Sequence, residues 1–419
     1  MASEFRLGWK PLAAATLGVA CGASPIPFNV LPIVIGPINA DLGWSFLQIS
    51  AAVTIYGIIG ALLAPVIGAL VDKHGVKPVA LTALGLFGVS FAAMYAVPSN
   101  LPAFYILWAV IGIVGIGSTP VSWSRAISMW FHANRGLALG ILLLGTSLAA
   151  LVVPQLSNYV LEQAGWRSVF PVVALLPLVI ALPLALVFFR EPEPHELPQQ
   201  AVDEGGALKG LTRNEALKSY RFYVLFASIC LVALAYGGAH IHMVQIVILS
   251  GFDASFAATV ISFVAIGIFL GRIIVGVLFD RFWAPGVAFP VLCLPVISCL
   301  LLTSGTNSEA LILLAGFFLG FAAGAESDVV AFMAARFFGL LEFGRIYGLL
   351  YMPFGIFASI SPLLYGYVRD QTGSYNLMLQ VSMVLFAVGG ALLLTLGRYP
   401  ELRAGKAATP PTPAQPAAA

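Results

Sequence analysis

Long apolar segments, separated by short polar or Gly/Pro-containing turns, follow one another along almost the whole chain. A helix needs about 20 apolar residues to cross the ~30 Å hydrocarbon core of a bilayer. We expect each of the following segments to form a membrane-spanning helix: 11–39, 46–71, 77–96, 101–129, 136–161, 168–189, 221–249, 254–279, 285–303, 308–335, 344–368 and 375–397. The pattern therefore predicts an all-α membrane protein with twelve transmembrane helices.

The composition supports this prediction. Of the 419 residues, 60% are hydrophobic and 9% are charged, whereas soluble domains carry about 25% charged residues. The first ten residues lack the apolar core and cleavage site of a secretory signal peptide, so we expect no such segment to be removed. The four cysteines all lie in apolar segments without disulfide or metal-ligand spacing, and we expect neither a metal nor a cofactor.

One long polar break divides the spans into two groups of six. It holds most of the charge that lies outside the apolar segments, and it includes the sequence EPEPHELPQQ. We therefore expect four regions: an N-terminal six-helix bundle at 1–190, a cytoplasmic linker at 191–220, a C-terminal six-helix bundle at 221–403 and a disordered Ala/Pro-rich tail at 404–419.

The two halves of the chain repeat each other at a constant offset. Asp72 near the end of the second span and Asp280 near the end of the eighth are 208 positions apart. The same offset relates four further pairs: Gly68 with Gly276, Gly140 with Gly348, Pro154 with Pro362, and Gly165 with Gly373. A constant offset without gaps indicates two parallel copies of a six-span unit. Such repeats suit alternating access, in which the substrate is held near the membrane midplane between the copies.

The basic residues gather on one side of the predicted helices. If the N-terminus is inside the cell, Arg167 and Arg369 fall outside, while the other loop lysines and arginines are cytoplasmic. Cytoplasmic loops of membrane proteins carry an excess of Lys and Arg. We therefore expect a multi-pass protein of the inner (plasma) membrane with both termini in the cytoplasm.

Arg272 lies inside the eighth span, eight residues before Asp280. At ~1.5 Å per residue, it is roughly 12 Å deeper than that aspartate. A guanidinium at this depth in hydrocarbon costs several kcal/mol, so it should face a cavity or a partner, and it is a candidate functional residue. Arg125, near the end of the fourth span, is interpreted instead as a side chain that snorkels to the interface, with substrate contact as the alternative.

The loop after the second span, GALVDKHG at 68–75, resembles the corresponding loop of the major facilitator superfamily and is echoed at 276–281. Glycine allows close helix approach, and aspartate at a helix end can bond neighbouring backbone or basic groups. We expect the polar residues at these helix ends to latch conformations rather than to touch substrate: Asp72, Lys73, Asp280, Arg281 and Arg135.

The start of the fifth span carries an aromatic residue and a phenylalanine, then an arginine followed by x-Leu-Ala-x-Gly, and a glycine five residues on. The matching residues are Phe131, Arg135, Leu137, Ala138, Gly140 and Gly145. This pattern resembles the fifth-span signature of the monocarboxylate transporter family of the major facilitator superfamily, which includes bacterial lactate–proton symporters. The resemblance covers essentially all twelve spans. It implies proton-coupled movement of lactate, pyruvate and similar acids, with Arg272 binding the carboxylate.

The chain departs from the animal members of this family at two proton-handling positions. Ile268 stands where they carry an aspartate, and the first span has no lysine. The tenth span offers Glu326 and Asp328 instead, and Asp328 lies at about the depth of Arg272. In one interpretation Asp328 simply pairs with Arg272, or Glu326 bonds a neighbouring helix. In the other, a carboxylate substrate takes the arginine once a proton neutralises Asp328 or Glu326, which couples the two in a low-dielectric cavity.

Several other side chains are candidates for the transport path. His240 and His242 lie in the seventh span nearer the outer face, either as neutral histidines bonded to the backbone or as an outer proton station. Residues at mid-depth on the first, seventh, tenth and eleventh spans pack in the core or, as substrate-binding candidates, enclose the apolar end of a short acid: Phe28, Asn29, Tyr236, Phe332, Tyr351 and Phe354.

The sequence contains no phosphate-binding GxxxxGK[ST] loop and suggests no catalytic set, so neither an ATP-driven pump nor an enzyme is expected. The basic residues follow the topology, so nucleic acid is not an expected partner. We predict a proton-coupled symporter of short monocarboxylates, L-lactate or pyruvate, that works by alternating access in a lipid bilayer. The alternatives are an organic-anion exchanger without proton coupling and a transporter-shaped sensor that binds an acid without moving it.

Overall fold

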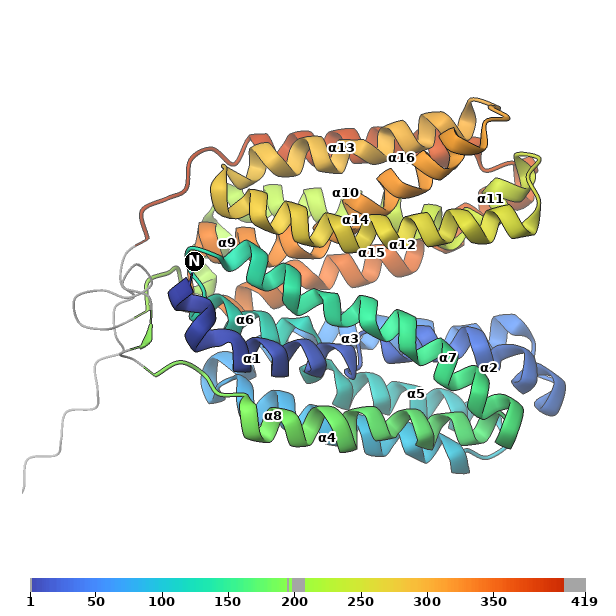
Figure 1. Cartoon of the computed structure of the whole chain (residues 1–419), viewed down its shortest axis with the longest axis horizontal. Coiled ribbons are helices and arrows are strands. Elements are labelled where there is room, and N and C mark those ends of the chain that lie inside the picture. Colours follow the sequence, from blue (N-terminus) through green and yellow to red (C-terminus); the bar gives the residue numbers. More distant parts are fainter. Residues whose placement is uncertain (1, 194–195, 198–207, 403–419) are drawn as a thin grey trace, which may run out of the picture.

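The computed structural model describes residues 2–193, 196–197 and 208–402, which are almost entirely helical (Figure 1). The α-helices are α1 (Ala2–Ala20), α2 (Ile26–Leu42), α3 (Phe46–His74), α4 (Val76–Ala92), α5 (Leu101–Gly115), α6 (Pro120–Trp130), α7 (Arg135–Leu175), α8 (Leu182–Phe188), α9 (Arg213–Lys218), α10 (Tyr220–Ile241), α11 (Met243–Leu249), α12 (Ala254–Arg281), α13 (Ala284–Thr303), α14 (Glu309–Phe338), α15 (Phe343–Thr372) and α16 (Asn376–Leu394). Short 3₁₀ turns extend α4 and α5, and a π-helical turn joins α7 to α8. The predicted tail, 404–419, lies outside the described residues.

The twelve predicted spans are confirmed as twelve helical crossings. Ten helices of the described chain are long and apolar enough to cross a membrane. One of these, Arg135–Phe188, has a non-helical residue at Gly165, with φ +78°, and so provides the fifth and sixth crossings. The first crossing differs from the continuous helix expected for 11–39, because α1 ends at Ala20 and α2 begins at Ile26. Pro25 and Pro27 have no N–H to donate, which favours an interruption there.

The crossings form two six-helix bundles, α1–α8 and α10–α16, which are the lower and upper halves of Figure 1. The start of α1 and the linker helix α9 both lie on the left of that view. This end also carries Lys73, Arg135, Arg281 and Arg345, and we call it the basic end. The two bundles contact each other where α3 packs on α15 and where α7 packs on α12.

Both bundle contacts depend on glycine pairs that the internal repeat relates. A Cβ added at Gly68 would lie 1.9 Å from the Gly344 carbonyl oxygen, and one added at Gly136 would lie 2.2 Å from the Gly276 carbonyl oxygen. These contacts are backbone against backbone, so no side chain can move aside to make room. The absence of a side chain at these positions is what lets the bundles close at the basic end.

We therefore predict that Gly68→Ala separates the bundles at the basic end. Overpacking costs ~1–3 kcal/mol, which changes the ratio of closed to open molecules by about five-fold to 150-fold. Spin labels at His74 and Phe282, in a cysteine-free background, report the separation as longer distances. Gly36→Ala is the matched control, because nothing lies within 4 Å of a Cβ at Gly36. An unchanged distance distribution for Gly68→Ala contradicts the prediction.

Candidate functional site

Arg272 lies on α12 at the contact between the two bundles. Its side chain is buried, with the residue 8% exposed, and its Nη1 donates a hydrogen bond to the carbonyl of Leu143 on α7. Its Nε has no acceptor among the described residues. The guanidinium thus reaches from the C-terminal bundle to the backbone of the N-terminal bundle, and its Nε–H is left without an acceptor among the described residues.

Asp328 lies beside Arg272 because α12 and α14 pack closely. A Cβ added at Gly324 on α14 would lie 2.3 Å from the carbonyl oxygen of Ile268 on α12. Arg272 and Asp328 follow these two residues by four positions, about one helical turn. On the α7 side, a Cβ at Gly140 would lie 2.6 Å from the Arg272 carbonyl oxygen and 3.6 Å from Asp328 Oδ2. Three helices therefore converge on one arginine and one aspartate, within electrostatic reach of each other.

Two phenols complete the surroundings of this pair. Tyr236 on α10 and Tyr351 on α15 both interact electrostatically with Arg272. Tyr351 also lies beside Ser24, in the interruption between α1 and α2. The structure therefore brings together four residues singled out in the sequence, and the interruption between α1 and α2 lies next to them. The four are Arg272, Asp328, Tyr236 and Tyr351.

Aromatic rings extend from Tyr351 in two directions. On α15 it contacts Tyr347 and Phe354, with ring centroids 5.8 Å and 5.5 Å away. Toward the N-terminal bundle it lies near Tyr56, which donates a hydrogen bond to the Ala23 carbonyl. The Tyr56 ring meets Phe28 edge-on at 5.9 Å, and Phe28 is 51% exposed. Phe28 and Phe354 thus belong to an aromatic surface that leads to the charged pair.

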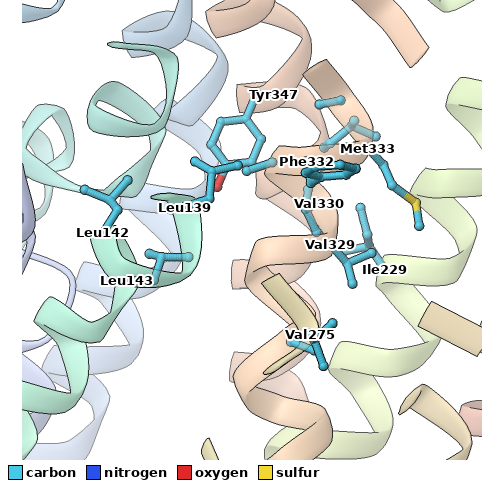
Figure 2. Close-up of a cluster of buried hydrophobic side chains, with 14 of the residues drawn as sticks. Leu139, Leu142, Leu143, Ile229, Val275, Val329, Val330, Phe332, Met333 and Tyr347 are labelled. Carbon is cyan, nitrogen blue, oxygen red and sulfur yellow. The ribbon is translucent and has the colours of Figure 1, made fainter. Parts of the chain in front are cut away.

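Two other candidates face elsewhere. The Asn29 side chain donates a hydrogen bond to the Pro25 carbonyl of its own helix, at 2.8 Å. Phe332 is 2% exposed and packs on Phe279 with ring centroids 5.2 Å apart. Figure 2 shows leucines of α7, Leu139 and Leu143 among them, opposite Phe332 and its neighbours of the C-terminal bundle. In this state Phe332 therefore belongs to an apolar contact between the bundles.

Glu326 points into the interior of the C-terminal bundle. It is 6% exposed, and its Oε1 has no hydrogen-bond partner in the described part of the chain. It lines a cavity of about 20 Å³ whose other walls, apart from Ser228, are apolar. A void of that size is large enough for a single water molecule. Tyr236 interacts electrostatically with both Glu326 and Arg272, so this phenol is within electrostatic reach of each.

The two histidines of the seventh crossing have different surroundings. His240 stacks on Tyr236 with ring centroids 5.2 Å apart, and its buried Nδ1 has no partner among the described residues. His242 is held at both nitrogens, by the Pro362 carbonyl at 3.1 Å and by the Tyr375 hydroxyl at 3.0 Å. The carbonyl can only accept, so Nε2 donates to it, and the ring is held in one orientation by a partner at each nitrogen.

Asp72 and Asp280 each cap a helix of the opposite bundle. Asp72 accepts from the backbone N–H groups of Gly344 and Arg345, at 2.9 and 2.8 Å. Asp280 accepts from those of Gly136 and Leu137, at 2.6 and 2.9 Å. A carboxylate at a helix N-terminus satisfies free N–H groups and interacts favourably with the helix dipole. The two caps hold the bundles together at the basic end.

The interpretation of Arg125 as a snorkelling side chain is wrong. Arg125 is 7% exposed, and its Nε lies 2.9 Å from Asp72 Oδ1. Its Nη1 lies 3.4 Å from Oε2 of Glu191, whose other oxygen accepts the Val76 N–H at 2.7 Å. Neither Glu191 nor this ion pair was identified from the sequence. The contact depends on how the sixth crossing returns to the fourth, and no local pattern records that.

The remaining latch candidates have different environments. Arg135 is 3% exposed and donates to the carbonyls of Phe131 and Ser128, at 3.2 and 3.0 Å, so it caps the end of α6. Lys73 and Arg281 are exposed and make neither a hydrogen bond nor an ion pair within the described residues. In the described part of the chain, no three His, Cys, Asp or Glu side chains are grouped as metal ligands would be, and the four cysteines are free thiols.

Comparison with known proteins gives consistent matches. The sequence profile of the Major Facilitator Superfamily matches residues 17–352. Monocarboxylate transporter 13 of Rattus norvegicus is 27% identical over 346 residues, which are 80% of this chain and 77% of the relative. The probable sulfoacetate transporter SauU of Cupriavidus necator is 25% identical over 374 residues, 84% of this chain and 85% of the relative. The structure of the E. coli fucose:proton symporter FucP superimposes with a TM-score of 0.69, at 15% identity, covering 94% of this chain and 99% of that one.

We predict that Arg125→Gln destabilises the protein more than Asp72→Asn does. Loss of Arg125 leaves two carboxylates, Asp72 and Glu191, without their shared cation, and breaking a buried ion pair costs ~3–5 kcal/mol. Asp72→Asn leaves the pair of Arg125 and Glu191 intact. Thermal unfolding of the purified protein measures the difference. Arg190→Gln is the control, because Arg190 pairs with Glu196 while 49% exposed, where pairs contribute about 0–1 kcal/mol. Equal losses for Arg125→Gln and Arg190→Gln would contradict the prediction.

Proposed function

This chain is a member of the Major Facilitator Superfamily, and we propose that it carries short monocarboxylates, such as L-lactate or pyruvate, across the plasma membrane together with a proton. The basic end faces the cytoplasm in this proposal, and the two bundles open alternately to the two sides around a central site. The observation that carries the proposal is the pair of Arg272 and Asp328, buried where the bundles meet.

The chemistry of Arg272 supports a carboxylate as the substrate. Guanidinium is permanently charged, and its planar set of donors matches the two oxygens of a carboxylate. In this state one donor is on the Leu143 carbonyl and Nε has no acceptor in the described chain. A carboxylate substrate would take the place of the carbonyl, which would also free α7 from its bond to α12.

Charge balance supports coupling to a proton. Arg272 and Asp328 together are neutral, and a second carboxylate would leave one uncompensated negative charge in a low-dielectric interior. Protonation of one carboxyl group removes that charge. Asp328 is our first choice for this group because it lies within electrostatic reach of Arg272. Glu326 is the second, because Tyr236 interacts electrostatically with both Glu326 and Arg272.

The lining of the site supports a short acid. Tyr351 and Phe354 form one aromatic wall, and Tyr56 with Phe28 continues it toward the N-terminal bundle. Such surfaces bury an apolar end, whereas the single guanidinium matches one carboxylate. Two relatives are named for the transport of small organic anions, one as a monocarboxylate transporter and the other as a probable sulfoacetate transporter.

One observation favours a second candidate, an exchange of organic anions without a proton. Ile268 stands one turn before Arg272, where animal monocarboxylate transporters carry an aspartate. Proteoliposomes separate the two functions. Uptake of labelled lactate that follows an inward proton gradient supports symport, whereas uptake that requires internal substrate and ignores the gradient supports exchange.

We predict that Arg272→Lys lowers lactate uptake about ten-fold to hundred-fold. Lysine keeps the charge but loses the paired donors, and a charge-assisted hydrogen bond contributes ~1.5–3 kcal/mol. Initial uptake rates in proteoliposomes, normalised to inserted protein, measure the effect. Arg213→Lys, at an exposed position on α9, should transport as the unmodified protein does. Uptake by Arg272→Lys at the unmodified rate would exclude Arg272 as the carboxylate site.

We predict that Asp328→Asn still binds and exchanges lactate but no longer accumulates it in response to a proton gradient, because the amide mimics the protonated acid permanently. Counterflow with internal lactate measures exchange, and gradient-driven uptake measures coupling. Glu326→Gln is the matched comparison: it should keep accumulation if Asp328 is the proton site. Accumulation by Asp328→Asn with loss in Glu326→Gln would assign the proton to Glu326 instead.

A further inference from the structure

A cavity of about 320 Å³ opens at the basic end, and both bundles contribute to it. The N-terminal bundle provides His132 and Arg135, from the turn before α7. The C-terminal bundle provides Arg336, near the end of α14, and the segment that follows α16. Lys209 of the linker forms another wall, and its position is fixed because its carbonyl accepts the Leu340 N–H at 2.9 Å. The cavity is far from the pair of Arg272 and Asp328 along α14 and is not part of that site.

The cations that line the cavity make no ion pair within the described residues. Arg135 uses its donors on two backbone carbonyls, and Arg336 lies over the Tyr399 ring at 4.6 Å with a buried Nε that has no acceptor among the described residues. Burial, together with the charges of Arg135 and Arg336, lowers the pKa of His132 to about 4. His132 is therefore neutral near pH 7 and able to donate an N–H without adding charge.

Three acids lie near these cations, and two of them accept hydrogen bonds from backbone N–H groups. Glu4 accepts four hydrogen bonds, from the backbone N–H groups of residues 132–134 and from the Asn134 amide. Asp280 accepts two backbone N–H groups of α7. Glu401 lines the cavity but is exposed at its rim. Within the described residues, no ion pair joins Arg135, Arg336 or Lys209 to an acid.

The internal repeat shows that the C-terminal half lacks a carboxylate that the N-terminal half has at the equivalent position. In the N-terminal half, Glu191 accepts the Val76 N–H at 2.7 Å and pairs with Arg125. The equivalent position in the C-terminal half, 208 residues later, is Tyr399, whose hydroxyl accepts the Ala284 N–H at 2.9 Å. The phenol reproduces the hydrogen bond but not the negative charge. Arg125 of the N-terminal half is thus paired with carboxylates, whereas Arg336 of the C-terminal half lines a cavity and makes no ion pair within the described residues.

We propose that this cavity binds the phosphate group of a cytoplasmic ligand, either free phosphate or the headgroup of an anionic phospholipid. Guanidinium and ammonium groups match the oxygens of a phosphate group, which accept several charge-assisted hydrogen bonds at once. Free phosphate carries more than one negative charge near pH 7, whereas a phosphodiester headgroup carries one, and both present these oxygens. The inference does not depend on which substrate the chain transports.

Binding at this place has a consequence for the transport cycle. Arg135 and Arg336 belong to different bundles, so the complete site exists only while the basic ends are together. A ligand that binds one of two states shifts their ratio by 1 + [L]/Kd, about eleven-fold at ten times Kd. Phosphate on the cytoplasmic side should therefore hold that side closed and slow the cycle.

Thermal unfolding of the purified full-length protein in detergent tests the site with inorganic phosphate, against sodium chloride at equal ionic strength. We expect a saturable rise in the unfolding temperature for the unmodified protein, and a rise reduced to less than half for Arg336→Gln and for Lys209→Gln. Lys218→Gln removes an exposed lysine of α9 and should respond as the unmodified protein does. If Arg336→Gln does not fold, Lys209→Gln still decides the question.

The same variants in nanodiscs distinguish the two sources of phosphate. A lipid headgroup is the ligand if phosphatidylglycerol stabilises the protein more than phosphatidylcholine does and inorganic phosphate has no effect. This stabilisation must be lost in Lys209→Gln and kept in Lys218→Gln. A response to inorganic phosphate assigns it to a free ligand. Equal stabilisation of all variants by either probe overturns the proposal, because a general ionic effect would then account for the result. The proposal is also overturned if neither probe stabilises any variant or the unmodified protein.

Discussion

A permanently charged guanidinium at the depth of the hydrocarbon core has to be compensated, and the centre of the molecule is arranged around that constraint. Arg272 cannot lose its charge at any accessible pH, so its surroundings must supply acceptors or negative charge. They do so from both bundles: Asp328 from α14, the Leu143 carbonyl from α7, and phenols from α10 and α15. Any motion that separates the bundles must break part of this set, so compensation of one charge is coupled to the conformation of the whole chain.

At the basic end, the groups that need partners are backbone N–H groups at helix starts. A helix that begins at an interface has N–H groups without intrahelical partners. The start of α7 and the start of α15 each meet an aspartate from the other bundle, and the repeat makes the two arrangements equivalent. The same contacts require glycine, because a side chain would keep the aspartate too far from the N–H groups. The close approach of the helices at glycine and the capping by aspartate therefore occur together at both bundle contacts. Both are made only while the bundles are together.

Periodicity and repeat offset were enough to predict the crossings, the two bundles and the shared depth of Arg272 and Asp328. These features depend on helix geometry, which is local, and on an offset that can be read directly. The interruption of the first crossing at residues 21–25 could be anticipated only in part, because prolines 32 and 37 lie within α2 without breaking it. The ion pair of Arg125 with Glu191 joins residues 66 positions apart. Such a contact depends on tertiary packing, and the two residues do not belong to a common sequence motif from which the pairing could be predicted.

The differences between the two halves are more informative than their similarities. Where the repeat is kept, as at Asp72 and Asp280, the function of a residue can be argued from its counterpart. Where the two halves have different residues at equivalent positions, the function of a residue in one half cannot be argued from the other. Arg272 has Ala64 as its counterpart, so one arginine, not a symmetric pair of arginines, lies at the centre. Arg125 corresponds to Met333 and Glu191 to Tyr399, so the N-terminal half places an arginine between two carboxylates, while the C-terminal half has uncharged side chains at the positions of Arg125 and Glu191. The two copies of one unit therefore carry different charges on a common backbone, and the interior between them is electrostatically asymmetric although the helices are arranged symmetrically.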